Sequence, residues 1–450
     1  MNSGFVRVIN RREVLSLAFG AMVGWSWVAL SGVWVNNAGP AGAVTAFLLG
    51  GTAVILVGLT YAELASAMPL VGGEHAYSKR ALGKTASFVC TWAILLGYVS
   101  VVAFEAVALP TVLEYLIPGF SQGYLWTVAE WEVNASWVAT GSLPAISMVV
   151  LNCIGIRTAA KLQVLVVVII LLIGVALFCG AAVYGDVGNV APGFVGGMAG
   201  MASVLVMVPF MFVGFDVIPQ SAEEVNVPFA DIGRLLVVSI VMAVLWYAAV
   251  IGAVALGLPA ARRSEATLPT AEAATALFGG EWAGQLLVIG GIAGIITSWN
   301  AFLIGGSRAL YALAAAGQAP AVFGVLHPKY RTPHRAIMLV GGFAIIAPLF
   351  GRPAMVWLVD AGGLGIVTAY AMVALSFLVL RKREPDMQRP YRVGCGRLVG
   401  SAALLLSVGL ASLYLPWSPA ALIWPQEWAI VIFWCLLGAL FFWVTRRAGS

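Results

Sequence analysis

Long apolar stretches recur along the whole chain, and this feature limits the possible folds more than any other. The run VLVVVIILLIGVALF at residues 164–178 is apolar on every face. A stretch of about 18 such residues or more crosses a hydrocarbon core roughly 30 Å thick as a helix. Strands of a membrane barrel would instead alternate apolar and polar residues over about ten positions. The pattern therefore predicts an all-α membrane protein.

The apolar stretches predict about twelve membrane-spanning helices in one domain that covers residues 1–450. They occupy residues 14–36, 40–67, 84–116, 134–153, 160–185, 198–221, 232–258, 283–316, 335–350, 354–380, 398–416 and 427–445. The longest polar connections, near residues 116–135 and 259–282, are too short for a soluble domain. Only 10% of the residues are charged, against about 25% in soluble domains, which excludes a soluble enzyme.

Basic residues predict the orientation in the membrane. If the N-terminus is cytoplasmic, the opposite side holds only three of the 24 Lys and Arg residues, namely Arg262, Arg263 and Arg352, while Arg308 lies within a span. By the positive-inside rule, both termini are then cytoplasmic in a multi-pass protein of the inner membrane. Because the membrane explains where the positive charges lie, we expect membrane lipid as a partner and no nucleic acid.

The first and sixth predicted helices are interrupted by glycine. The first reads GAMVGWSW at residues 20–27 and the sixth reads FMFVGFDVIP at residues 210–219. A broken helix exposes backbone groups that a ligand, an ion or a protein cavity must satisfy. Two halves of five helices would be inverted relative to each other, so that one site can face either side. We expect a ten-helix inverted-repeat core at residues 13–383, followed by two further helices at residues 398–445. The alternative is that the glycines only allow close helix packing.

Six motifs occur in the order and spacing of a known group of proteins. They are GAMVG at residues 20–24, AGPAGA at 38–43, YAELASAMPLVGGEHAYSKRALG at 61–83, NCIGIRTAAKLQ at 152–163, FMFVGFDVIPQSAEEVNVP at 210–228 and TSWNAFLIGGSRALYALAAAGQAP at 297–320. From about residue 12 to residue 383, the chain resembles the amino acid, polyamine and organocation (APC) transporter superfamily. The resemblance implies a fold of five plus five inverted helices and two peripheral ones. It also implies secondary transport of a small amine or amino acid by alternating access, rather than an enzyme. A channel and a solute receptor are the alternatives from other classes.

The resemblance places a substrate at the first interruption. In the family, backbone amides after the glycine that matches Gly24 receive a substrate carboxylate, as the positive end of a half-helix does. Here Trp25, Ser26 and Trp27 follow, where the family usually has small residues. Two indoles are able to hold an organic cation by cation–π contact. The alternative is that they pack against neighbouring helices.

The third and sixth helices supply carboxylates. Tyr98, Val101 and Glu105 share one face of the third helix. A carboxylate within the membrane is costly, so Glu105 is a candidate for attracting a cationic substrate or carrying a proton. Asp216 lies in the second interruption, where family members often carry an acid. The other candidates for substrate binding are Phe210, which by family position covers the substrate, Val213, Gly214, Trp299 and Phe302.

The resemblance also bears on the coupling ion. Members that use sodium place hydroxyls of the eighth helix beside backbone carbonyls of the first, and Thr297 and Ser298 match these positions, with the backbone near Ala21 and Gly24. Some proton-coupled relatives place a lysine from the fifth helix there, and residues 164–184 contain none. This favours Na⁺, and a carboxylate proton relay or exchange without an ion are the alternatives. The structural alternative is that the two hydroxyls only bond to the backbone of their own helix. No other cofactor is expected.

Charged residues at the predicted cytoplasmic helix ends form the last candidate set. We interpret them as an inner gate in which ion pairs break and form again, and a simple positive-inside anchor is the alternative. They are Glu63, His75, Lys79, Arg80, Glu223 and Glu224. Asp360, near the start of the tenth helix, is a further candidate.

Overall fold

The computed structural model describes residues 7, 9–154 and 156–448. Both chain ends and Gly155, which belongs to the predicted connection between the fourth and fifth helices, lie outside the described residues. Within these ranges, ten helices are long and apolar enough to cross a membrane, and a shorter apolar helix spans His334–Phe350. The chain is an all-α membrane protein with one small hairpin.

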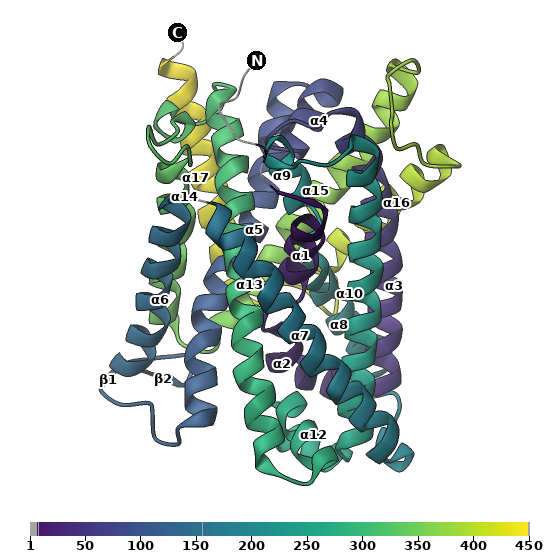
Figure 1. The fold of residues 1–450 in the computed structure, drawn as a ribbon, viewed down its shortest axis with the longest axis vertical. Coiled ribbons are helices and arrows are strands. Elements are labelled where there is room, and N and C mark those ends of the chain that lie inside the picture. The colour runs from purple at the N-terminus through teal and green to yellow at the C-terminus, as the bar shows by residue number, and fades with distance from the viewer. Residues whose placement is uncertain (1–6, 8, 155, 449–450) are drawn as a thin grey trace.

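The long helices follow one another in the predicted order (Figure 1). They are α1 (Arg11–Met22) with α2 (Ser26–Ala29), α3 (Ser31–Ala67), α5 (Lys84–Leu116), α6 (Ala135–Ile154), α7 (Ile156–Tyr184), α8 (Gly197–Phe212) with α9 (Val217–Gln220), α10 (Phe229–Gly257), α13 (Glu281–Ala315), α14 (His334–Ile346), α15 (Ala354–Arg383), α16 (Gly396–Leu413) and α17 (Gln426–Ala448). Shorter elements connect them: α4 (Glu74–Leu82), β1 (Tyr124–Val128), β2 (Trp131–Asn134), η1 (Val187–Val190), η2 (Ala222–Glu224), α11 (Ala260–Glu265), α12 (Pro269–Phe278), η3 (Ala321–Gly324) and η4 (Ala347–Phe350).

The helix α3 contains parts of two crossings. Gly39 has φ +73 and ψ 165, outside the helical region, and Pro40 follows it. A Cβ at Gly39 would lie 2.5 Å from the carbonyl oxygen of Gly193. The backbone segments around Gly39 and Gly193 are therefore so close that this position requires glycine. The first crossing thus consists of α1, α2 and the start of α3, and the predicted boundary between the first two spans is confirmed.

The packing of the helices repeats after five membrane crossings, when the crossings are numbered in chain order. The second crossing, in α3, packs against α10, α5 packs against α13, and α6 packs against α14. The contact of α5 with α15 is likewise matched by that of α13 with α7. Since each half contains five crossings, equivalent helices run in opposite directions, as the prediction of an inverted repeat requires. The most apolar window of α5 is 89% buried and that of α17 only 17%, so α5 is central and α17 peripheral.

One hairpin in the connection at residues 116–135 was not predicted. Strand β1 pairs antiparallel with β2, and the turn between them contains Ala129 and Glu130, with φ 48 and 64. Tight hairpin turns with positive φ usually carry Asn-Gly or a similar pair. That signature is missing here, so the residue pattern did not reveal the hairpin.

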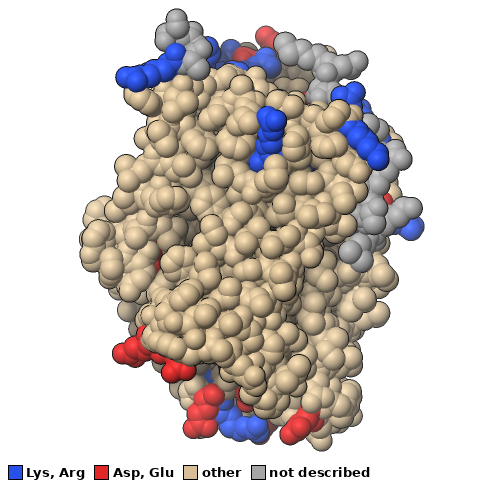
Figure 2. Space-filling model, turned by 90° about the vertical axis from the view of Figure 1, so that its left-hand side faces the viewer, with Lys and Arg blue, Asp and Glu red and all other residues tan. Residues whose placement is uncertain are grey.

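Charge is distributed unevenly between the two ends of the molecule. On the face shown in Figure 2, Lys and Arg gather at the upper end, where α17 finishes, and most Asp and Glu lie at the lower end. The last turn of α15 adds Arg381, Lys382 and Arg383 to the upper end. We call this the basic end.

Candidate functional site

The first interruption separates α1 from α2. Helical backbone ends at Met22, and Val23 has φ −108 and ψ 68. Tyr247 of α10 donates a hydrogen bond to the carbonyl oxygen of Met22 at 2.7 Å. The Tyr247 hydroxyl also lies 2.9 Å from Oγ of Ser26. The neighbouring helix therefore satisfies part of the exposed backbone.

The second interruption lies between α8 and α9 and is held by Asp216. Gly214 has φ +134, a conformation that residues with a Cβ rarely adopt. Oδ1 of Asp216 accepts the backbone N–H of Gly214 at 2.7 Å, and Oδ2 accepts the hydroxyl of Tyr98 at 2.7 Å. Both carboxylate oxygens are therefore used to order the break and to attach it to α5.

The two interruptions touch each other. A Cβ at Gly214 would lie 2.7 Å from Cβ of Ala21 and 2.9 Å from the backbone nitrogen of Met22. Residues that are almost 200 positions apart therefore form one site at the centre of the bundle. The structure brings together the two sets of residues that the sequence placed in separate motifs.

Glu105 of α5 reaches the first interruption. Its side chain is 1% exposed, and Oε1 lies directly against Gly24. The carboxylate interacts with the side chain of Ser298 and the backbone N–H of Trp25. Oε2 is buried and has no hydrogen-bond partner among the described residues. A buried carboxylate with one free oxygen is costly unless a cation or a proton joins it.

The two indoles pack against different helices. The six-membered ring of Trp25 lies against Gly291 of α13. Trp27 makes a T-shaped contact with Trp246 of α10, with ring centroids 5.4 Å apart. Both side chains are fully buried. Their contacts are those of the packing alternative.

Aromatic rings from several helices surround the interruptions. Phe210 makes an edge-to-face contact with Phe104 at a centroid distance of 5.7 Å, and Phe302 lies 5.4 Å from the ring of Tyr98. The remaining predicted side chains are buried in the same core, namely Val101, Val213 and Trp299. The predicted candidates on the third, sixth and eighth helices thus line an apolar centre around the carboxylates.

Oxygen atoms of α1 and α13 converge beside the first interruption. Oγ1 of Thr297 lies 3.1 Å from the carbonyl oxygen of Gly20 and 2.9 Å from that of Gly294. A Cβ at Gly294 would lie 2.5 Å from the carbonyl oxygen of Gly24 and 3.3 Å from that of Val23. The sequence had indicated the backbone near Ala21, and Thr297 contacts the carbonyl oxygen of the residue before it, Gly20. Together with the Ser298 hydroxyl, this is an all-oxygen cluster of the kind that unwound helices offer to a coupling ion.

Sequence reasoning missed Gln163 of α7. Its amide nitrogen Nε2 donates to the backbone carbonyls of Thr297 at 3.3 Å and Ser16 at 3.4 Å. It therefore ties α1 to α13 next to the oxygen cluster. The available signal was a single amide that immediately precedes the apolar run at residues 164–178.

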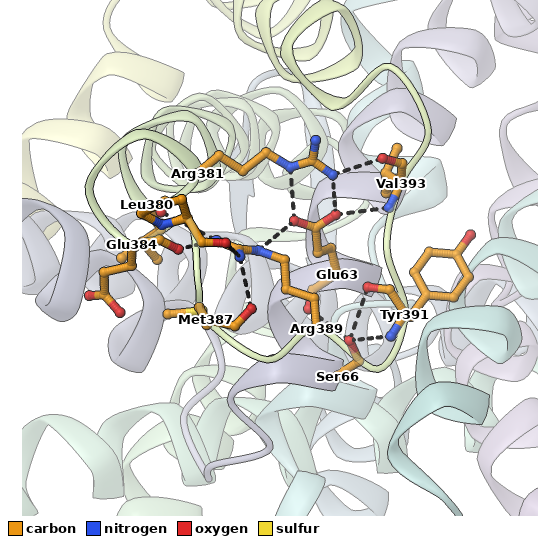
Figure 3. A network of polar contacts seen from close by, with 10 residues as sticks. Glu63, Ser66, Leu380, Arg381, Glu384, Met387, Arg389, Tyr391 and Val393 are labelled. Atoms are coloured by element: carbon orange, nitrogen blue, oxygen red, sulfur yellow. Dashed lines mark hydrogen bonds and ion pairs between the residues drawn. The ribbon is translucent and has the colours of Figure 1, made fainter.

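Ion pairs close the basic end. Glu63, at the end of α3, accepts hydrogen bonds from Arg381 and lies 3.0 Å from Nε of Arg389 (Figure 3). Glu224 pairs with Arg308 at 3.0 Å, and both side chains are buried. The pairs of Glu63 join α3 to α15 and to the segment after it. The pair of Glu224 joins the segment after α9 to α13.

The other residues of the predicted inner gate have varied contacts. Arg80 forms an exposed pair with Glu384, and Glu223 accepts the backbone N–H of Val71 at 3.1 Å. Burial lowers the pKa of His75 to about 4, with a smaller contribution from Lys79. His75 is therefore neutral at pH 7 and takes no part as a cation.

The opposite end of the molecule is hollow. A cavity of 260 Å³ there is lined by Ala29, Leu30 and Val33 of the first crossing, together with Thr111 and Arg352. Asp360 forms a side-chain hydrogen bond with Glu427 of α17. Ion pairs thus join the helices at the basic end, and this cavity lies at the opposite end.

These features define a class of protein. Two broken helices that meet at mid-bundle within an inverted repeat are the construction of a secondary transporter. The family model described as amino acid permease matches residues 9–446, and the chain belongs to this family. It is a transporter rather than an enzyme, and the resemblance to the APC superfamily is confirmed.

Similar proteins carry different solutes. The branched-chain amino acid permease BcaP of Bacillus subtilis is 25% identical over 99% of this chain and 94% of its own length. The methylthioribose transporter of the same organism is 23% identical over 100% and 95%. Cationic amino acid transporter 4 of Mus musculus is 29% identical over 85% of this chain and 61% of its own length. The solute of this chain therefore depends on its own side chains and not on family membership alone.

Proposed function

We propose that this protein is a secondary active transporter that moves a small amine, or an amino acid, across the cytoplasmic membrane by alternating access, coupled to Na⁺. The observation that carries the proposal is the buried carboxylate of Glu105 beside the first interruption, which contacts the second one. The basic end is cytoplasmic in this proposal, which agrees with the positive-inside rule.

The contacts of Glu105 favour an amine over an amino acid. Its carboxylate accepts hydrogen bonds from the backbone N–H of Trp25 and the Ser298 side chain, and a substrate carboxylate would have to compete for these donors. Its Oε2 is left for an ammonium group. Asp216 has both oxygens engaged, so it orders the break while Glu105 holds the positive charge. An amino acid is the second choice, because Glu105 would have to withdraw from the amides to admit it.

The oxygen cluster of Thr297, Ser298 and the carbonyls of α1 supports sodium coupling. A hard cation prefers oxygen ligands, and the cluster links α1 to α13, so a bound ion would tie two helices of the opposite halves together. The residues present fit such an ion. Glu105 also supports a second candidate, a proton-coupled permease, because its free oxygen is able to take a proton.

Competition between matched pairs of solutes tests the substrate class. Each pair consists of an amine and the amino acid with the same side chain, such as isobutylamine and valine, and both compete against a labelled substrate of the purified protein in liposomes. The amines should inhibit at lower concentration throughout. Consistent preference for the carboxylate-bearing member would overturn the amine assignment, and the absence of uptake of every amine and amino acid would overturn the transporter proposal.

A further inference from the structure

A cavity at the basic end lies outside the transport site. It has a volume of 690 Å³ and lies between the end of α15 and the start of α16, lined by Arg381, Arg392, Arg397, Leu398 and the backbone of residues 393–396. A Cβ at Gly394 would meet nothing within 4 Å. The cavity therefore has space for a group larger than a water molecule.

The segment around the cavity carries excess positive charge. Residues 381–397 contain six Lys or Arg and two Asp or Glu. Glu63 is shared between Arg381 and Arg389 (Figure 3), and Glu384 is paired with Arg80. Among the described residues, neither Arg392 nor Arg397 forms a salt bridge. An anion would therefore be attracted to this cavity.

Arg381 presents a free edge of its guanidinium to the cavity wall. Nε and Nη2 bond to Glu63, and Nη2 also donates to the carbonyl oxygen of Val393 at 2.8 Å. Nη1 makes none of these bonds (Figure 3) and lies directly against Gly396. A guanidinium held in place on one side is a well-oriented donor for phosphate oxygens on the other.

An apolar stripe continues from the cavity along α16. Leu398, which lines the cavity, and Leu405 are both 72% exposed, and a spacing of seven residues puts them on one helical face. Val408, one turn further, is 53% exposed. Exposed leucines on a membrane helix face acyl chains, so a positively charged pocket opens directly above the lipid-facing surface.

We propose that this cavity binds the headgroup of an anionic phospholipid, whose acyl chains lie along α16. Basic pockets at the cytoplasmic ends of membrane helices are suited to such headgroups, and the leucine stripe fits a lipid better than a free phosphate. Arg381 joins this site to Glu63, so the bound lipid and the ion pairs at the basic end would share one guanidinium.

Lipid binding to the purified full chain tests the proposal. The protein, held in phosphatidylcholine and detergent, is titrated with phosphatidylglycerol, and bound lipid is counted by native mass spectrometry. The double variant Arg392→Gln/Arg397→Gln should bind phosphatidylglycerol about 30-fold more weakly, because each basic residue near anionic lipid contributes several-fold. Arg392→Lys/Arg397→Lys should retain most of the binding. The matched control is Arg11→Gln/Arg12→Gln, two exposed arginines at the same end, which should leave it unchanged.

Three results would overturn the proposal. They are equal retention of phosphatidylglycerol and phosphatidylcholine, equal binding by the Arg392→Gln/Arg397→Gln variant and the unchanged protein, and displacement of phosphatidylglycerol by an equal concentration of inorganic phosphate. The last would show a site for a soluble anion. Arg392 and Arg397 are exposed, so their replacement should leave the melting temperature in phosphatidylcholine unchanged, which separates loss of lipid from loss of fold.

Discussion

At the scale of single residues, the account depends on Glu105. Its carboxylate is buried, bonded on one oxygen and free on the other. The replacement Glu105→Gln keeps the shape and removes the charge, so an amine would lose its ionic partner. We expect amine affinity to fall by about 30-fold or more, since loss of one member of a desolvated charge pair typically costs 2–5 kcal/mol. Binding is measured by competition against the labelled substrate.

The matched control for this change is Glu114→Gln on the same helix. Glu114 is only partly buried near the C-terminal end of α5 and should have little influence on affinity. If Glu105→Gln bound amines as tightly as the unchanged protein, the role assigned to Glu105 would be wrong.

The sequence predicted the residues of the site better than their roles. Glu105 and Asp216 were visible because a carboxylate in an apolar helix stands out. The packing of Trp25 and Trp27 against two different helices was not visible in the sequence, because it depends on the direction in which the chain turns at the break. Gln163 and Tyr247 were missed because only the folded structure brings their polar atoms to the backbone of α1.

At the scale of helices, Gly214 tests whether the second interruption is required. Gly214→Ala places a Cβ in a backbone conformation with positive φ and within 2.9 Å of the backbone of Met22. Strain of this kind costs about 1–3 kcal/mol, so we expect a lower melting temperature and reduced uptake. Gly252→Ala is the matched control, since a Cβ there meets nothing within 4 Å and alanine favours the helix. A normal melting temperature and normal uptake of Gly214→Ala would argue against a functional break.

The ion pairs at the basic end allow a second test on helices. Glu63→Gln leaves two arginines without their shared buried carboxylate, and breaking a buried pair costs about 3–5 kcal/mol. Glu384→Gln removes one exposed pair with Arg80, which should cost less than about 1 kcal/mol. Differential scanning fluorimetry of both variants compares them. Equal melting temperatures would show that Glu63 does not hold this end together.

The order and number of crossings could be predicted from the sequence because each crossing needs a long apolar run. The predicted spans at residues 14–36 and 40–67 agree with the kink at Gly39. Local turn chemistry could not be predicted as well, and the hairpin at Ala129 and Glu130 shows why. Residues without a turn signature adopt positive φ there when the surrounding structure holds them.

At the scale of the whole molecule, we predict that the segment at residues 259–282 faces the outside. Ser264 on α11 is exposed, so a cysteine introduced there into a cysteine-free background should react with an impermeant reagent on intact cells. A cysteine at Arg331, which is also exposed but lies in the connection expected to be cytoplasmic, should react only after lysis. Reversal of these two results would place the basic end outside.

Accumulation of substrate in proteoliposomes tests the central claim most directly. With an inward sodium gradient, the purified protein should concentrate a labelled amine, and choline in place of sodium should abolish the accumulation. In the variant Thr297→Ala/Ser298→Ala, the sodium gradient should no longer drive accumulation, because the variant lacks two oxygen ligands of the cluster beside α1. Thr368→Ala/Ser376→Ala removes two hydroxyls that bond to their own helix backbone and should behave like the unchanged protein. Equal accumulation with sodium and with choline would contradict sodium coupling, and flux that only follows the substrate gradient under every ionic condition would contradict active transport.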